Sequence, residues 1–566
     1  MRFNNKIYQM KRVLLSIGVM LGMVASGQQL RYLDEVYSNV TVMNDIEYGV
    51  NIDFLTSDLT DQAQVAADIT EIKSALALGN PIPAKFYDPT DTASDVKVAS
   101  LKVDFYEPTG DTATARPLII YIHTGNFLPP PINGGPTGTR QDSVGIVQCT
   151  NWAKRGFAAA SVSYRLGWNP LAPTALERRG QLLNAVYRAI HDVKQLVRVM
   201  KANAATYKID PSQIVLYGQG SGGYVSLAYA SMDKWSELEI PKFINPLTQQ
   251  SYVDSNLVGN LEGFGGLLNL YAPNGESSDI AFTVNTGGAL ADTSWLEAGD
   301  APVVSFQCVR DAFAPFDEGT VIVPTTNEDV VDVQGANVFI DKANTLGNNT
   351  YNSRTYTDPI TMKAQGRYGQ TIDYIYPAPN DMITIRQNLD GLFPVIKPLG
   401  ASLFQNQSSP WEWWDPNSPT ASAVIDPGPP PITAHQAGLL SNPDMSPMQG
   451  RTYLDTINGY AIPRIMVSLQ LPGYDQISVE EYGVLNGVVS MFPNPTSNTL
   501  TISWTEATSR EGLTIEVIDL TGRAVMSEDG FRGGERVLNV SALTPGAYLV
   551  RLSGQEGVFT DRVIVR

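Results

Sequence analysis

The sequence predicts an α/β fold with a mostly parallel sheet covered by helices, followed by a small C-terminal antiparallel β-sandwich. Three observations predict it. Short buried strand patterns alternate with helix patterns between residue 100 and about residue 472. A long amphipathic helix pattern connects two of these strands. From about residue 485 the chain changes to short alternating strands separated by turns.

Four strand patterns define the predicted parallel sheet: Pro117–Ile122, Phe157–Ser163, Ile214–Tyr217 and Ala301–Phe306. Between the second and the third, apolar residues from Leu182 to Met200 recur every three or four positions, as on one face of a helix. Strands joined by helices imply right-handed crossovers and a sheet covered on both faces. A short opening strand over Val40–Tyr48 precedes this region, and a polar stretch follows it up to residue 100.

Residues 320–450 have a less regular pattern. They contain the proline-rich run Pro427–Pro431 and the aromatic cluster Trp411-Glu-Trp-Trp414. We interpret this segment as a long insertion, or cap, over the C-terminal edge of the sheet. The tryptophans are consistent with ordinary core packing or with a binding surface for an apolar or sugar-like ligand, and the sequence leaves both open.

Composition restricts the class of function. A length of 566 residues exceeds one compact core, so at least two folding units are expected. The 39 basic and 57 acidic residues give a net charge of −18, which disfavours nucleic acid and anionic lipid as partners. Cys149 and Cys308 could form a disulfide in an oxidising compartment or remain as two buried thiols. The sequence has no CxxC, HExxH or His/Cys cluster, so neither a metal nor another cofactor is expected.

The N-terminus predicts export. Lys11 and Arg12 precede an apolar run from Val13 to Val24, and small residues follow up to Gly27. This order is typical of a signal peptide over residues 1–27, with a short anchor as the alternative. No later segment reaches about 18 unbroken apolar residues, so no transmembrane segment is expected in the mature chain.

The segment Tyr217–Ala230, YGQGSGGYVSLAYA, follows a buried strand and opens a small-residue helix. It resembles the nucleophile elbow of α/β-hydrolases, where G-x-S-x-G makes a tight strand-to-helix turn. Other segments are similar to parts of secreted carboxylesterases and lipases: the elbow lead-in 209–214, the His123-Thr-Gly-Asn-Phe127 loop, 154–156 and 163–167. The resemblance covers about residues 35–320 and implies an α/β-hydrolase-like domain over 28–475.

The registration of the elbow decides the predicted activity. Gly218 and Gly222 match the two glycines of the pattern, which puts Gly220 at the nucleophile position and Ser221 directly after it. Glycine tolerates the strained elbow conformation freely but supplies no attacking oxygen. Loss of the nucleophile costs about a million-fold in turnover in a serine protease. The sequence therefore predicts an impaired hydrolase that binds a small ester-like or carbonyl ligand.

The resemblance implies the remaining site residues. Asp311 matches the catalytic acid, and His123, Gly125 and Asn126 match the oxyanion loop, which the backbone N–H of Ser221 would complete. Only His435 follows Asp311 and so fits the serine–acid–histidine order, although its surroundings predict a loop. His191 lies on the amphipathic helix, solvated or packed.

Two other functions stay open. The first is an active ester hydrolase that uses Ser221, Asp311 and His435. The second is a structural or adhesive surface protein that uses the fold as a scaffold. Under the Gly220 registration, Gly220→Ser is expected to restore hydrolysis only if a histidine lies beside the new hydroxyl.

Residues 485–566, after a linker at 476–484, resemble a type A sorting domain of type IX secretion. The motifs lie in order at 492–498, 513–523, 543–551 and 562–566. A carbohydrate-binding or adhesion sandwich is the alternative. The resemblance implies a bacterium of the Bacteroidota, Sec export, translocation by the type IX machinery, removal of this domain, and release or attachment at the cell surface.

Overall fold

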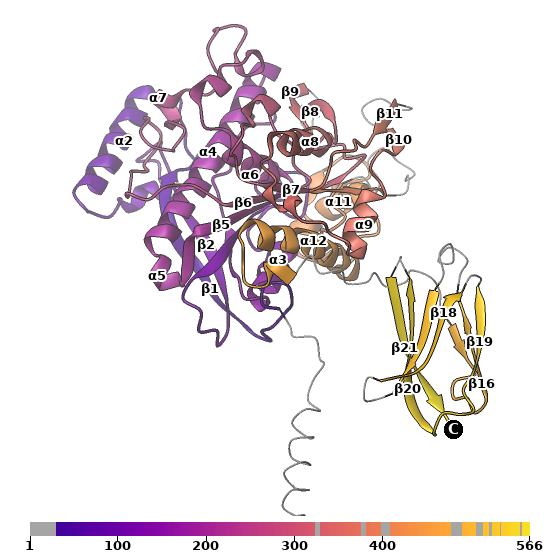
Figure 1. Cartoon of the computed structure of the whole chain (residues 1–566). Coiled ribbons are helices and arrows are strands. Elements are labelled where there is room, and N and C mark those ends of the chain that lie inside the picture. Colours follow the sequence, from indigo (N-terminus) through magenta and orange to yellow (C-terminus); the bar gives the residue numbers. More distant parts are fainter. Residues whose placement is uncertain are drawn as a thin grey trace, which may run out of the picture. The chain divides into compact units, whose positions relative to one another are not determined.

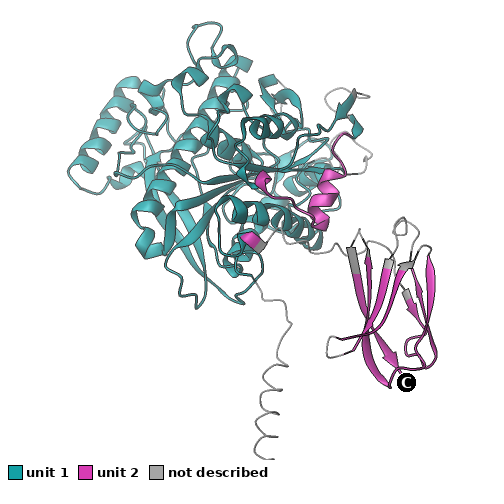
Figure 2. Cartoon of the chain, in the orientation of Figure 1, with its two compact units in different colours: residues 1–351, 370–474 teal, residues 352–369, 475–566 magenta. Residues whose placement is uncertain are grey.

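The chain forms two compact units. In this computed structural model, unit 1 comprises residues 1–351 and 370–474, and unit 2 comprises residues 352–369 and 475–566 (Figure 2). The structure describes residues 30–322, 329–374, 381–397, 408–476, 490–504, 513–519, 523–531, 534–554 and 557–566. The expected signal peptide (residues 1–27) and all but the first residue of the expected linker (476–484) lie outside the described residues.

Unit 1 is built on an eight-stranded sheet of order β1-β2-β4-β3-β5-β6-β7-β12. β1 and β2 pair antiparallel, as do β2 and β4, and every other neighbouring pair is parallel. The predicted mostly parallel sheet is therefore confirmed. The strands are β1 (Val40–Ile52), β2 (Val98–Pro108), β3 (Arg116–Ile122), β4 (Ala158–Val162), β5 (Ile209–Gln219), β6 (Phe282–Thr286), β7 (Val303–Cys308) and β12 (Leu392–Val395).

Helices cover both faces of this sheet (Figure 1). On one face, α3 (Ser143–Lys154) and α12 (Pro447–Ser468) are joined by a hydrogen bond of 2.9 Å from Trp152 Nε1 to Asn458 Oδ1. On the other face, α4 (Ala175–Ala202) packs against α6 (Ser221–Ser231). Because both faces are covered, all residues of β3 and β4 are buried, as their continuous apolar runs predict.

Several elements correct the sequence-based interpretation. The polar stretch before residue 100 contains α2 (Gln62–Ala77), which is capped by Asp61 and buries Val65, Ile69 and Ile72 at helical spacing. The segment 320–450 is only in part an insertion, because it supplies β12, the last strand of the sheet, and α8 (Ala336–Leu346), which packs against β7. Four-residue strands such as β12 are too short to give a periodic signal.

The rest of the 320–450 segment adds small elements. β8 (Glu318–Ile322) and β9 (Asp329–Gln334) form an antiparallel hairpin, and β10 (Thr371–Tyr374) pairs with β11 (Asp381–Thr384). α10 (Pro419–Ser422), β13 (Val424–Asp426), β14 (Ile432–Thr433) and α11 (Ala434–Ser441) follow. His435 therefore lies in a helix, and the loop predicted around it is wrong; Thr433 begins that helix with a capping box.

Unit 2 contains the predicted antiparallel β-sandwich. One sheet has the order β15-β16-β19 and the other β18-β17-β20-β21. Their shared core includes Leu500, Trp504, Val517, Val550 and Val563. The strands are β15 (Ser490–Phe492), β16 (Thr499–Ser503), β17 (Leu513–Ile518), β18 (Ala524–Phe531), β19 (Glu535–Asn539), β20 (Gly546–Gly554) and β21 (Gly557–Val565). α9 (Pro359–Gln365) also belongs to unit 2.

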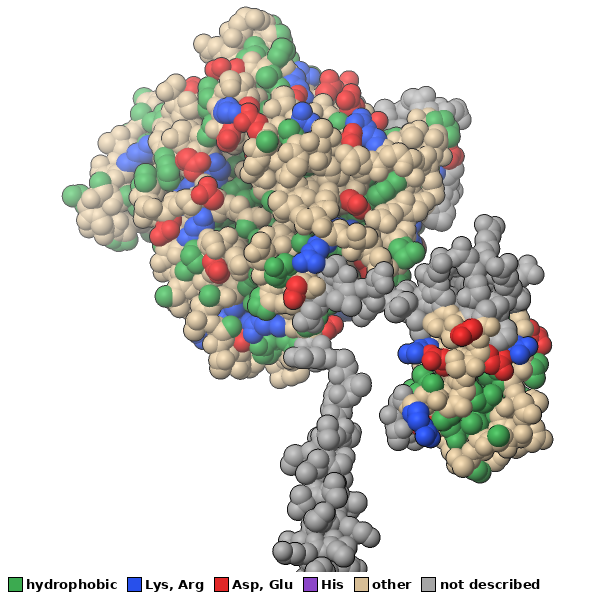
Figure 3. All heavy atoms as spheres, viewed as in Figure 1, with side chains coloured by type: hydrophobic (Ala, Val, Ile, Leu, Met, Phe, Trp, Pro, Cys, Tyr) green, Lys and Arg blue, Asp and Glu red, His purple; other side chains and the backbone are tan. Residues whose placement is uncertain are grey.

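Three further features concern the surface, the helices and the two cysteines of the described chain. On the face drawn in Figure 3, acidic and basic side chains are interspersed. None of the helices in the described residues is long and apolar enough to cross a membrane. Cys149, in α3, and Cys308, at the end of β7, are both buried and free, so the open question of a disulfide is answered in favour of two thiols.

A buried ion pair joins α4 to the segment after β4. Asp192 Oδ1 accepts a hydrogen bond of 2.9 Å from Arg165 Nε and another of 2.8 Å from the Tyr271 hydroxyl. The exposed fractions of the Arg165 and Asp192 side chains are 1% and 0%. Removing one member of such a pair leaves an uncompensated charge in the protein interior, which is strongly destabilising.

We therefore expect Asp192→Asn to lower the free energy of unfolding of unit 1 by about 3–5 kcal/mol. Urea unfolding followed by circular dichroism measures this change, because most of the described helices belong to unit 1. Asp455→Asn, at an exposed position of α12, is the matched control and should change stability by less than about 0.5 kcal/mol. Equal stability of the two variants would contradict the prediction.

Candidate active site

The turn between β5 and α6 has Gly220 at its apex. Gly220 has φ 53° and ψ −117°, a conformation that side-chain-bearing residues rarely adopt, and its N–H donates to Thr286 O on β6 at 2.8 Å. The flanking glycines are required by close packing. A Cβ at Gly218 would overlap Gly222 O, and a Cβ at Gly222 would overlap Ile122 O at the end of β3. The glycine spacing thus produces the sharp strand-to-helix turn that the sequence predicts.

Thr124 occupies the space in front of this apex. A Cβ built on Gly220 would overlap Thr124 Oγ1 and would lie 2.9 Å from Thr124 Cβ, closer than real Cβ atoms approach. The threonine belongs to the loop after β3 and lines the same cavity as Gly220. A side chain at position 220 therefore requires this loop to move.

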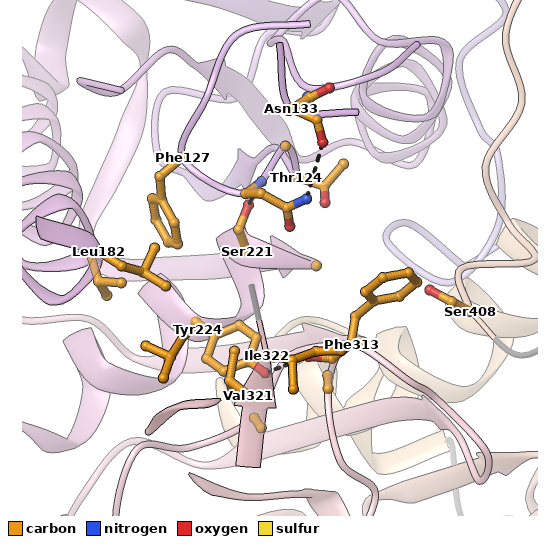
Figure 4. Close-up of a pocket in the computed structure, with 18 of the residues that line it drawn as sticks. Thr124, Phe127, Asn133, Leu182, Ser221, Tyr224, Phe313, Val321, Ile322 and Ser408 are labelled. Carbon is orange, nitrogen blue, oxygen red and sulfur yellow. Dashed lines mark hydrogen bonds between the residues drawn. The ribbon is translucent and has the colours of Figure 1, made fainter. Parts of the chain in front are cut away.

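Ser221 is the first residue of α6, and its hydroxyl has neighbours other than an imidazole. Its Oγ accepts a hydrogen bond of 3.2 Å from the backbone N–H of Asn126 and lies 3.5 Å from the Tyr164 hydroxyl oxygen. The Tyr164 hydroxyl donates to His123 O at 2.8 Å. Ser221 lines the cavity with an exposed fraction of only 6% (Figure 4).

The loop 123–127 lies beside Ser221 in a strained conformation. Gly125, Asn126 and Phe127 all have positive φ. Two contacts hold it: Trp168 Nε1 donates to Asn126 O and the Gly167 N–H donates to Phe127 O, both at 2.8 Å. The backbone N–H of Asn126, which the resemblance assigns to an oxyanion hole, is used here by the Ser221 hydroxyl.

None of the three histidines lines the cavity. His123 Nδ1 donates to Thr124 O at 2.6 Å, and burial lowers its pKa to about 4. His191 lies buried inside α4, where burial and the nearby cations Arg165 and Lys194 hold its pKa well below the usual value. His435 Nδ1 accepts a hydrogen bond of 3.1 Å from Trp414 Nε1. The structure does not bring His435 together with Ser221 and Asp311 in the cavity.

Two carboxyl groups line the cavity instead. Asp311 follows β7 and is 2% exposed; its Oδ1 accepts the backbone N–H groups of Phe313 and Ala314 at 2.8 and 3.0 Å. Burial raises the pKa of Asp311 to about 7 despite these two bonds. Glu412 Oε1 accepts a hydrogen bond of 2.5 Å from Gln219 Nε2. Burial and the nearby Asp142 carboxylate raise the pKa of Glu412 to about 8.

The cavity has a volume of about 570 Å³. Gly125, Asn126, Gly220, Ser221 and Asp311 line it, so most of the predicted site residues meet there. Figure 4 shows Phe127 and Leu182 to the left of Ser221, Val321 and Ile322 below it, and Ser408 to the right. Of the aromatic cluster, Trp411 and Trp413 are buried, as core packing predicts, whereas Trp414 is buried and also lines the cavity.

Sequence reasoning missed Thr124 and Glu412. Thr124 stands where the resembling loop has a glycine, and that departure was the available signal for a filled apex. Glu412 is the one charged residue of the cluster Trp411-Glu-Trp-Trp414. A glutamate flanked by tryptophans in the sequence is unusual, because a segment rich in tryptophan tends to be buried and burial disfavours the charge. Glu412 lies beside Gln219 because the chain folds back toward the elbow after β12. No local sequence pattern indicates this contact.

The sheet, the elbow and the covering helices define an α/β-hydrolase fold like that of esterases and lipases. Comparison with known families agrees: the model described as BD-FAE matches residues 103–296, and the secretion system C-terminal sorting domain matches residues 490–566. The chain thus combines an esterase-like α/β-hydrolase domain with a type IX sorting domain. The sorting domain assigns the chain to export by the type IX machinery, as a secreted or cell-surface protein.

Two relatives support the same class. Secreted lipase 5 of Gibberella zeae is 26% identical over 314 residues, which is 50% of this chain and 51% of that protein. Human arylacetamide deacetylase-like 3 is 25% identical over 146 residues, which is 26% of this chain and 30% of that protein. The chain therefore spans about half or less of the length of these relatives.

Solved structures of Thermogutta terrifontis esterase 2 are also similar. The form phosphonylated by cyclosarin is 20% identical, with a TM-score of 0.25, over 38% of this chain and 69% of that one. The butyrate-bound form is 17% identical, with a TM-score of 0.25, over 41% of this chain and 73% of that one.

The raised pKa of Glu412 predicts a pH-dependent stability. The unfolded chain loses the proton near the ordinary glutamate pKa of about 4.3, whereas the folded chain keeps it until about pH 8. The contribution of Glu412 to the free energy of unfolding is therefore fully present below pH 4. It declines, by up to about 1.4 kcal/mol per pH unit, as the pH rises to 8. We expect Glu412→Gln to become more stable relative to the parent chain between pH 5 and 8.

Urea unfolding at constant ionic strength across this pH range measures the difference. Glu71→Gln, at an exposed position of α2, is the control and should give a curve parallel to that of the parent chain. Parallel curves for Glu412→Gln would show that Glu412 titrates normally.

Proposed function

We propose that the α/β-hydrolase domain binds a small ligand in the cavity beside the elbow without forming an acyl-enzyme. The observation that carries this proposal is the apex of the elbow, where Gly220 supplies no oxygen and Thr124 fills the adjoining space. Acyl transfer through a serine requires a hydroxyl at this apex and a base within hydrogen-bond reach.

The neighbouring Ser221 is a poor substitute for the missing nucleophile. Its hydroxyl contacts the Asn126 N–H and lies near Tyr164, and neither group can accept its proton as a general base at neutral pH. Burial raises the pKa of the Tyr164 hydroxyl above its ordinary value, and the hydrogen bond with Ser221 offsets only part of that rise. His435, the base that the serine–acid–histidine order would require, is bonded to Trp414 instead.

The cavity favours ligand binding over a purely structural role. A volume of about 570 Å³, mostly apolar walls and a few convergent polar groups are typical of a small-molecule site. A scaffold or adhesin would have no need to keep this space open beside Asp311 and Ser221. Export through the sorting domain would present this site outside the cell or on its surface.

We expect a fluorescent fluorophosphonate to leave the native chain unlabelled, because the reagent reacts with activated serines. Short-chain nitrophenyl esters should not be hydrolysed above the rate given by Ser221→Ala, which serves as the control variant. Labelling or turnover that disappears in Ser221→Ala would overturn the proposal and establish an active hydrolase that uses Ser221.

Gly220→Ser is expected to destabilise the protein by about 1–3 kcal/mol, because the new side chain strains the backbone and collides with Thr124. The double variant Thr124→Gly/Gly220→Ser should recover part of this loss. Thr124→Gly alone is the control for the loop. A melting temperature of Gly220→Ser equal to that of the parent chain would show that the apex has room for a nucleophile.

A further inference from the structure

The charges around the cavity are all of one sign. Among the described residues that line the cavity, Asp311 and Glu412 are the only carboxylic acids. None of these lining residues is a lysine, an arginine or a histidine. Asp142 and the Tyr121 hydroxyl lie close to Glu412, and the Tyr224 hydroxyl lies close to Asp311. None of these neighbours carries a positive charge.

Asp311 has an oxygen available to a ligand. Its Oδ1 accepts two backbone N–H groups, whereas Oδ2 accepts no hydrogen bond from any described residue. A Cβ built on Gly287 would lie 3.8 Å from Asp311 Oδ2 and 3.9 Å from Ser409 Oγ, so both oxygens lie near Gly287 in the wall of the cavity. With the side chain 2% exposed, this oxygen is a buried acceptor that faces the cavity.

The walls of the cavity favour an apolar ligand. Phe127, Trp168, Phe313 and Trp414 line it, and aromatic faces attract cations that have given up part of their hydration. Leu182, Val321 and Ile322 add aliphatic surface to these walls (Figure 4). A small metal ion fits this site poorly, because calcium takes six to eight oxygen ligands. The described residues also contain no group of three or more metal-binding side chains.

We propose that the cavity binds an apolar compound with a substituted ammonium group, and that this group lies between the carboxylates of Asp311 and Glu412. The inference rests on the proposed ligand-binding function and names its ligand class. Alkyl substituents reduce the hydration that a cation must lose on entry, and two carboxylates in an apolar site then compensate its charge. The aromatic and aliphatic walls contact the rest of the ligand.

Two isosteric probes test the charge requirement on the full exported chain. Phenyltrimethylammonium is positively charged at every pH, and tert-butylbenzene has the same shape without the charge. Calorimetric titration at pH 9, where both acids are ionised, should show at least a tenfold preference for the cation. At pH 6 the preference should shrink to threefold or less, because both acids are then largely protonated. Since the probe does not titrate, the change reports the protein.

Asp311→Asn and Glu412→Gln keep the shape of each side chain and should each reduce cation affinity at pH 9 at least fivefold, while binding of tert-butylbenzene stays unchanged. Asp455→Asn, on the surface of α12, is the matched control. Should either variant fail to fold, the pH dependence of the native chain still decides the matter.

Equal affinity for the two probes at pH 9, or a preference that does not change with pH, would overturn the inference alone. If neither probe binds, the ligand-binding proposal loses its support as well. Fluorophosphonate labelling of a chain that prefers the cation would overturn only the claim that the domain forms no acyl-enzyme.

Discussion

The conformation of one residue, at φ 53° and ψ −117°, organises the centre of this molecule. The chain must reverse between the central strand β5 and α6 within a single turn, and the backbone reaches this conformation with least strain at glycine. The turn brings the N-terminus of α6 against the loop after β3, and Gly218 and Gly222 allow the close approach because neither has a side chain. The loop 123–127 and the cavity in front of it are placed by this packing.

In an esterase the same turn stores strain so that a serine hydroxyl projects into the site. Here the apex carries only hydrogen, and Thr124 packs into the volume that a Cβ at this position would use. The two features are physically coupled, because a threonine at position 124 is compatible with glycine at position 220 and collides with any larger residue. The architecture of the turn is therefore kept, and under the proposed function its apex provides no attacking group for the chemistry of esterases.

The sequence predicts the parts of this fold that have strong local patterns. The buried apolar runs of β3 and β5, the long amphipathic helix α4 and the three glycines of the elbow are each encoded within a short window. β12 and Glu412 could not be predicted in the same way. β12 joins the sheet beside β7 after an excursion of more than 80 residues, and its four residues have no period of their own. Glu412 reaches the site only because that late segment returns over the elbow.

In the scaffold a buried cation is paired with a buried acid, whereas the acids of the cavity have no such partner among the described residues that line it. The buried Arg165 is paired with Asp192, whose carboxylate accepts hydrogen bonds from Arg165 Nε and from the Arg165 backbone N–H, so this pair stabilises one fixed arrangement. Asp311 is also buried and Glu412 is partly buried, yet no cation is among the described residues that line their cavity, and burial holds both pKa values near or above neutrality. In an esterase the catalytic acid would orient an imidazole and be stabilised by it. Without that imidazole, Asp311 keeps an unused oxygen at the cavity wall, and an entering positive charge is the group that would stabilise its ionised form.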